Sequence, residues 1–215
     1  MKTTTLCTLV SLLALLTIPV TAKDETSQVK QAAAIIQRFK SIPEKEIPRE
    51  VLRDAKGLAI LTVTKGGFVI SGKYGEGVIL ARTPTGWSGP AFIRTGGIGV
   101  GPQIGGSVTE FVLVLNTPDA VTAFAKGTNV QLGGAISVAA GPAGRSVEAG
   151  VMPKAAVYSY SVSQGLFAGV SLEGTIIKSN PKGNERYYNA AVSVGDILKG
   201  RVTVPSSAAE LRKSL

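Results

Sequence analysis

Histidine is absent from the 215-residue chain, and Cys7 is its only cysteine. The lack of histidine excludes the Ser-His-Asp triad, the Cys-His pair, the histidine-rich zinc site and the HExxH metalloprotease helix. A single cysteine cannot form a disulfide within the chain, and a chain of this length can bury about 70% of its unfolded surface without one. We therefore expect no catalytic residues, no metal and no cofactor.

Aromatic and charged residues are also scarce. Aromatic residues make up 6% of the chain, with one tryptophan, and charged residues make up 17%. So few aromatic side chains argue against a sugar-binding cleft, and no basic run interleaved with aromatics indicates nucleic acid as a partner. The charge is unbalanced, because 23 Lys and Arg against 14 Asp and Glu give a net charge of +9. An anionic surface is the first partner to consider.

The first 22 residues have the pattern of a cleaved secretory signal. Lys2 supplies the positive start, residues 6–18 are uncharged and rich in leucine, and small residues precede a cleavage site after Ala22. The apolar run is shorter than the ~20 residues that cross a bilayer. We expect the mature chain to begin near Lys23, to lack Cys7, and to be periplasmic or secreted.

Two helices are predicted at the start of the mature chain. Apolar residues recur at helical spacing over residues 27–40, and a second, short helix is predicted from Ile47 to a stop at Gly57. Thr117 and Pro118 open a short central helix that ends at Gly127, and a last helix is expected over residues 206–215.

Between these helices lie short runs rich in Val, Ile, Phe and Tyr, each bounded by Gly, Pro or Asn. The expected strands are residues 58–63, 67–70, 77–82, 91–95, 109–115, 134–139, 155–162 and 169–177. Together with a hydrophobic content of 44%, they predict one globular α+β domain over residues 23–215. Its body is expected to be a mainly antiparallel sandwich or barrel.

Several spacings resemble catalytic motifs and then depart from them. Residues 67–73 match the G-x-x-x-x-G-K spacing of a phosphate-binding loop, but Tyr74 replaces the required Ser or Thr, so a β-hairpin is the better interpretation. Residues 86–90 approach a nucleophile elbow, but Pro90 replaces its last glycine, which favours a turn with a packed indole. The glycines between Gly96 and Gly106 favour close backbone packing over a ligand loop.

Taken together and in order, several stretches resemble the SYLF-domain family. They are IPREVL at 47–52, AKGLAI at 55–60, KGGF at 65–68, GEGV at 75–78, WSGP at 87–90, GPAGR at 141–145, YSYS at 158–161, GLFAG at 165–169 and NERYY at 184–188. The resemblance covers roughly residues 30–204. It implies a lipid-binding module without known catalysis, whose eukaryotic members have phosphoinositides and actin as partners.

The resemblance also implies which residues meet lipid. An N-terminal amphipathic helix and nearby basic residues would make the contact, which places it on Lys30, Ile35, Ile36, Arg38, Phe39, Lys40 and Lys56. The predicted export signal makes actin and phosphoinositides doubtful partners for this chain, and favours anionic phospholipids of the cell envelope.

Three functions stay open. The first is a non-catalytic module that docks on anionic phospholipid membranes through the N-terminal helices. The second is a structural or protein-interaction domain in which the first helix belongs to the core, and the burial of Ile36 and Phe39 distinguishes the two. The third, ranked last, is an enzyme with a pocket that holds two of Lys73, Tyr160, Glu148 and Glu173.

Overall fold

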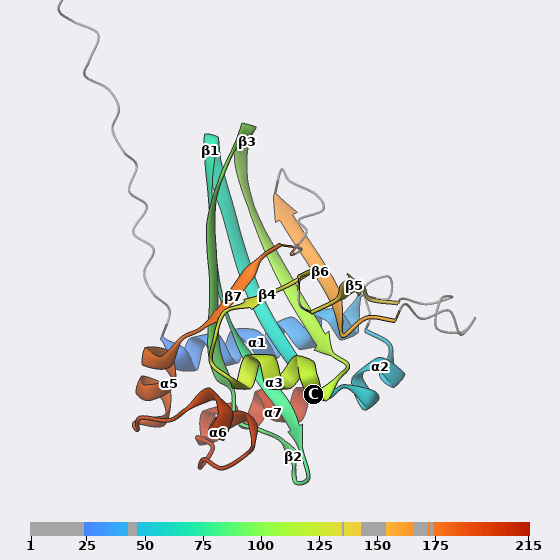
Figure 1. The fold of residues 1–215 in the computed structure, drawn as a ribbon, viewed down its shortest axis with the longest axis vertical. Coiled ribbons are helices and arrows are strands. Elements are labelled where there is room, and N and C mark those ends of the chain that lie inside the picture. The colour runs from blue at the N-terminus through green and yellow to red at the C-terminus, as the bar shows by residue number, and fades with distance from the viewer. Residues whose placement is uncertain (1–23, 43–46, 135, 143–153, 166–171, 173) are drawn as a thin grey trace, which may run out of the picture.

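The computed structural model describes residues 24–42, 47–134, 136–142, 154–165, 172 and 174–215. The predicted signal segment, residues 1–22 with Cys7, lies outside the described residues. Figure 1 shows strands that rise as a tall curled sheet from a base surrounded by helices. The α+β fold class, with helices at both ends of the chain and one between strands, is confirmed.

The elements follow one another along the chain with the bounds given next. The helices are α1 Glu25–Ser41, α2 Arg49–Asp54, α3 Pro118–Ala125, α5 Pro181–Tyr188, α6 Val194–Leu198 and α7 Ala209–Ser214, with the 3-10 turn η1 Ser206–Ala208 before α7. The strands are β1 Gly57–Thr83, β2 Gly86–Trp87, β3 Ala91–Leu115, β4 Val130–Gln131, β5 Val138–Ala140, β6 Val157–Gly165 and β7 Ile176–Ser179.

The sheet is built on one long antiparallel ribbon of β1 and β3. Their register runs from Gly57 opposite Leu115 to Ile79 opposite Ala91, with an irregularity between Phe68 and Ile70. The first part of β3 also pairs with β7, and its last part pairs with β6, both antiparallel. Strand β5 joins β6 in parallel, so the sheet is mainly antiparallel with one parallel pair.

The ribbon doubles back on itself. Ile60 and Gly77 would lie about 55 Å apart in a straight strand. Instead, a Cβ atom added to Gly77 would overlap the carbonyl oxygen of Ile60, and the Arg82 N–H donates to the Lys56 carbonyl at 2.8 Å. The two halves of β1 therefore lie against each other, and the turning point falls near the irregularity at residues 68–70. Only glycine, which has no side chain, allows this approach at position 77.

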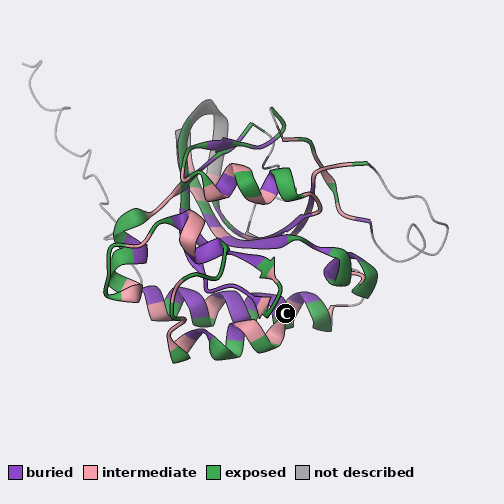
Figure 2. Cartoon of the chain, turned by 60° about the horizontal axis from the view of Figure 1, so that its bottom comes forward, coloured by how far each residue is buried: buried purple, intermediate pink, exposed green. Residues whose placement is uncertain are grey.

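Both faces of the doubled ribbon are covered at its base, because side chains alternate between the faces of a strand. One face packs against α1, α2 and α7, and the other packs against α3 and α6. Figure 2 shows the buried residues of the helices turned toward the sheet and the exposed residues turned outward. The first face contributes Leu58, Ile60, Val78, Leu80, Phe92, Val112 and Val114, and the second contributes Ala59, Leu61, Val63, Ile79, Ile93, Phe111, Leu113 and Leu115.

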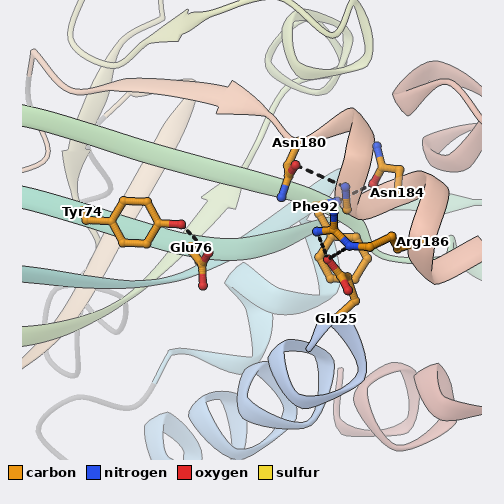
Figure 3. A network of polar contacts seen from close by, with 8 residues as sticks. Glu25, Tyr74, Glu76, Phe92, Asn180, Asn184 and Arg186 are labelled. Atoms are coloured by element: carbon orange, nitrogen blue, oxygen red, sulfur yellow. Dashed lines mark hydrogen bonds and ion pairs between the residues drawn. The ribbon is translucent and has the colours of Figure 1, made fainter. Parts of the chain in front are cut away.

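Polar contacts connect α5 to the rest of the base (Figure 3). The Arg186 guanidinium pairs with the Glu25 carboxylate at the start of α1. The Oδ1 atom of Asn184, which is fully buried, accepts the Phe92 N–H at 2.8 Å. Asn180 caps α5 by accepting the Gly183 N–H at 3.2 Å. These contacts join α5 to the start of α1 and to β3.

Most of the expected elements are present, but their bounds differ. Thr117 caps α3 as predicted, since its hydroxyl accepts the Ala120 N–H at 3.2 Å. The separate strands expected between residues 58 and 82 are one continuous strand, so the hairpin expected at 67–73 is the turning point of β1. Helices α5 and α6 were not predicted, because each is short and its apolar residues show no clear period.

The close crossing of β1 predicts a stability difference between two glycines of that strand. We expect Gly77→Ala to lower the free energy of unfolding by about 1–3 kcal/mol, because the new methyl group overlaps backbone that cannot rotate away. In the control, Gly72→Ala, a Cβ would meet no atom within 4 Å, so the change should stay within about 0.5 kcal/mol. Urea denaturation measures both, and equal midpoints would contradict the proposed crossing.

Candidate functional site

The three apolar residues expected to meet lipid lie in the core. Ile35, Ile36 and Phe39 are exposed by 2%, 1% and 1%. They pack with residues of β1 and β3 and with Ala208 and Leu211 of the C-terminal helices. The expectation that these side chains contact a bilayer is therefore corrected: the apolar side of α1 covers the sheet, and the helix is part of the core.

The cations expected to accompany these residues are not gathered on one face. Arg38 donates to the Glu110 carboxylate at 2.6 Å, so its charge is paired within the fold. Lys30 is exposed on α1 and lines none of the pockets described next. Lys40 and Lys56 are also exposed, and each lines a pocket at the base of the molecule.

The first of these pockets is lined mainly by cations. It has a volume of about 510 Å³ and lies between the end of α1, α2 and the C-terminal residue. Lys40, Arg49, Arg53 and Arg82 line it together with Ile47, Leu52 and Leu215. The Lys40 ammonium donates to the Ser214 carbonyl at 2.7 Å, which fixes the lysine at the rim. The pocket thus offers several positive charges around a partly apolar floor.

A second pocket adjoins the first and shares Arg82 with it. It has a volume of about 450 Å³, and Lys56, Arg82 and Lys199 add positive charge to a lining that includes Pro84, Pro118, Val121 and Leu198. The Arg82 guanidinium stacks 4.0 Å from the centroid of the Trp87 ring and donates to the Leu52 carbonyl at 3.2 Å. We call the six exposed cations of the two pockets, Lys40, Arg49, Arg53, Lys56, Arg82 and Lys199, the basic surface.

Acidic residues offset this charge only in part. Asp54 forms an ion pair with Arg53, and the hydrogen bond from Arg53 holds the pKa of the Asp54 carboxyl below its ordinary value. Glu50 is exposed on the same short helix. The lining residues of the two pockets include no Asp or Glu, so their positive potential is open to an anion.

A third pocket lies between α1 and β1. It measures about 160 Å³ and is lined by Gln28, Gln31, Tyr74 and Glu76 among others. The Tyr74 hydroxyl donates to the Glu76 carboxylate, and burial together with this bond raises the pKa of Tyr74 to about 12. The tyrosine is therefore protonated at neutral pH.

Of the residues proposed for an enzyme, the two that the structure describes have different partners. The Lys73 ammonium donates to the Thr175 hydroxyl at 2.9 Å, whereas the buried Tyr160 hydroxyl donates to the Pro142 carbonyl at 3.0 Å. Glu148 and Glu173 lie outside the described residues. Across the described ranges no His, Cys, Asp and Glu side chains gather in a group that could hold a metal ion. No helix in that part of the chain is both long and apolar enough to span a membrane.

Several residues of the stretches that carry the family resemblance have structural contacts. A Cβ on Gly89 would overlap the Tyr188 hydroxyl, which donates to the Pro90 carbonyl at 2.9 Å. A Cβ on Gly141 would overlap the ring of Tyr160. These residues therefore contribute close packing contacts to the fold.

The sequence offered a partial signal for the basic surface. Arg49 and Arg53 belong to the basic N-terminal helices, but the lipid contact that the resemblance implied lies on α1 and Lys56. Arg82 and Lys199 are more than 100 residues apart and are brought together only by the packing of α6 against β1. No spacing along the chain could have indicated that pair.

Comparison with known proteins gives consistent matches. The family described as "Ysc84: Las17-binding protein actin regulator" matches residues 96–215, which is more than half of the chain. The SH3 domain-containing YSC84-like protein 1 of Homo sapiens is 44% identical over 197 residues, which cover 88% of this chain and 58% of that protein. The LAS seventeen-binding protein 3 of Saccharomyces cerevisiae is 44% identical over 198 residues, which cover 87% of this chain and 42% of that protein. The chain thus spans about half the length of the curated relatives it matches.

The burial of α1 predicts that its apolar residues maintain stability. We expect Phe39→Ala to lower the free energy of unfolding by about 3–5 kcal/mol, because it leaves a cavity between helix and sheet. Gln37→Ala, on the exposed side of the same helix, is the control and should change stability by less than about 0.5 kcal/mol. Thermal or urea unfolding measures both. If Phe39→Ala were as stable as the wild type and had lost lipid binding, the expectation that Phe39 contacts lipid would be right and its structural role would be contradicted.

Proposed function

Since the chain belongs to the Ysc84 family, which is the SYLF family of the sequence resemblance, we propose that it is a non-catalytic module that binds anionic phospholipid through the basic surface. Six exposed cations around two adjoining pockets are the observation that carries this proposal. Each Lys or Arg close to an anionic lipid surface contributes about 1 kcal/mol to binding. The pocket of about 510 Å³ is also within the usual range of small-ligand sites, so it has room for a phosphorylated headgroup.

The proposed contact at the basic surface is electrostatic. Because the apolar side of α1 is buried, that helix has no apolar face to insert into a bilayer. Attraction between the exposed cations and lipid phosphates is screened by salt, with a Debye length of about 8 Å at physiological ionic strength. Binding through the basic surface should therefore fall steeply as salt is added.

The predicted signal segment belongs to the same proposal. Export would bring the module to anionic phospholipids of the cell envelope, in a periplasmic or secreted setting. The human relative is named for an SH3 domain that it contains, and the yeast relative is named for binding LAS seventeen. Each name describes that protein only.

A protein partner is the second candidate function. The burial of Ile35, Ile36 and Phe39 is the arrangement that the protein-interaction alternative requires. An acidic protein surface would suit the same cations as a phospholipid headgroup does. The two candidates differ in one observable, because only the first requires binding to vesicles that contain no protein.

The basic surface predicts a loss of vesicle binding when its charges are removed. We expect Lys40→Gln with Arg49→Gln to lower the partition onto phosphatidylglycerol-containing vesicles by about 30-fold at low salt, from two contributions of about 1 kcal/mol each. Co-sedimentation with vesicles measures the partition, and binding to neutral phosphatidylcholine vesicles should be weak for both proteins.

The matched control removes the same charge elsewhere. Lys178 and Lys182 are exposed on β7 and α5, and no residue of these two elements lines either pocket. Lys178→Gln with Lys182→Gln should lower binding by no more than about threefold, because distant charges are screened. Equal losses in the two double variants would show that net charge, and not the basic surface, determines binding.

A further inference from the structure

The second of the two cationic pockets has walls of mixed chemistry. Its lining joins three cations to five apolar residues and includes two threonines but no Asp or Glu. The cations are Lys56, Arg82 and Lys199, and the apolar residues are Ala81, Pro84, Pro118, Val121 and Leu198. We call this cavity of about 450 Å³ the mixed pocket.

Backbone contacts hold the three cations of the mixed pocket beside one another. The Lys56 carbonyl accepts the Arg82 N–H at 2.8 Å, which joins the start of β1 to its end. Gly200 follows Lys199 and lies against the end of β1, because a Cβ atom on Gly200 would come within 3.3 Å of the Thr83 methyl group. The main chain that carries the cations is therefore fixed, and a ligand does not have to gather them.

The apolar wall of the mixed pocket comes from α3 and α6, which are in contact at the base of the molecule (Figure 1). Val121 of α3 and Leu198 of α6 pack in the core on this side of the sheet. Val121 also lies against the start of β1, where a Cβ atom on Gly57 would come within 3.1 Å of its methyl group. Pro84 and Pro118 are exposed at the edge. The pocket therefore offers a fixed apolar surface that is partly open to solvent.

Charge and apolar surface together restrict the class of ligand. Two acidic residues adjoin the mixed pocket in sequence without lining it, because Asp119 follows Pro118 and Asp196 pairs with Arg201 at 3.5 Å. An inorganic anion would meet the cations but leave the apolar wall in water. A neutral apolar molecule would cover the wall but leave the cations without a counterion. A molecule with one anionic group on an apolar body meets both.

We propose that the mixed pocket binds a small soluble organic anion, an amphipathic monocarboxylate. Its carboxylate pairs with Lys56, Arg82 and Lys199, and its apolar chain lies on the wall formed by α3 and α6. The volume of about 450 Å³ is within the usual range of small-molecule sites. This inference goes beyond the proposed function, because the ligand is taken from solution and no bilayer takes part.

Trp87 can report binding, because it is the only tryptophan and the Arg82 guanidinium stacks 4.0 Å from its ring centroid. We expect octanoate, below its micelle concentration, to change the Trp87 fluorescence of the full chain in a saturable way. Affinity should rise by up to about fourfold per methylene from butanoate to octanoate. Isothermal calorimetry measures the same dissociation constants without the reporter. If acetate or octanol bound as tightly as octanoate, the proposal would be overturned, since the first lacks the apolar chain and the second lacks the charge.

Position 122 offers a matched pair of variants, because Thr122 lines the mixed pocket and is exposed on α3. Thr122→Glu places a competing carboxylate beside the cations and should weaken octanoate binding by about tenfold or more. Thr122→Gln adds a neutral side chain of the same size and should stay within about threefold of the wild type. Neither change should alter the unfolding midpoint, because the position is exposed. Equal octanoate affinities of the two variants would contradict the proposed position of the ligand.

Cations that line only one pocket separate this proposal from the proposed function. Lys199 lines the mixed pocket alone, whereas Lys40 and Arg49 line the other pocket alone. Lys199→Gln should weaken octanoate binding by about threefold or more, and Lys182→Gln on α5 should not. Lys40→Gln with Arg49→Gln should keep octanoate binding.

The two proposals can therefore fail separately. No octanoate binding by a wild-type chain whose vesicle binding depends on Lys40 and Arg49 would refute the mixed pocket alone. Octanoate binding that depends on Lys199, in a chain whose vesicle binding ignores Lys40 and Arg49, would refute the proposed function alone.

Discussion

The close crossing of the two halves of β1 is the constraint on which the rest of the structure depends. Gly77 lies against the backbone of Ile60, so a ribbon that could extend in one direction doubles back instead. Doubling gives the sheet two covered faces at its base, one for α1 and α7 and the other for α3 and α6. The contact between Gly77 and Ile60 therefore underlies both halves of the core.

The role of α1 follows from the same constraint. The face of the sheet beneath α1 is lined by apolar residues, and a helix must cover this face to remove it from water. Ile35, Ile36 and Phe39 do so, which leaves only the polar side of α1 in contact with solvent. The lysines and arginines of the N-terminal helices line pockets where α1, α2 and the end of β1 meet, around Arg82.

Sequence patterns predicted the elements better than the site. The period of α1, the Thr117 cap and the α+β class are all local or compositional signals, and the structure has them. An apolar period identifies a buried face but not what buries it, since lipid and a β-sheet demand the same spacing. Arg82 and Lys199 meet through tertiary packing, and the fold-back of β1 depends on Gly77 and Ile60, which are far apart along the strand. Neither relation has a local signature.

The basic surface depends on the same packing as the core. Arg82 lies near the end of β1, where it stacks on Trp87 and donates to the Leu52 carbonyl, so its guanidinium is held where the two pockets adjoin. Lys40 is held at the rim by its hydrogen bond to the Ser214 carbonyl. Side chains that the fold already positions lose less conformational freedom when they meet an anion than free lysines and arginines would. The basic surface is therefore a product of tertiary contacts, and the net charge of the chain does not by itself account for it.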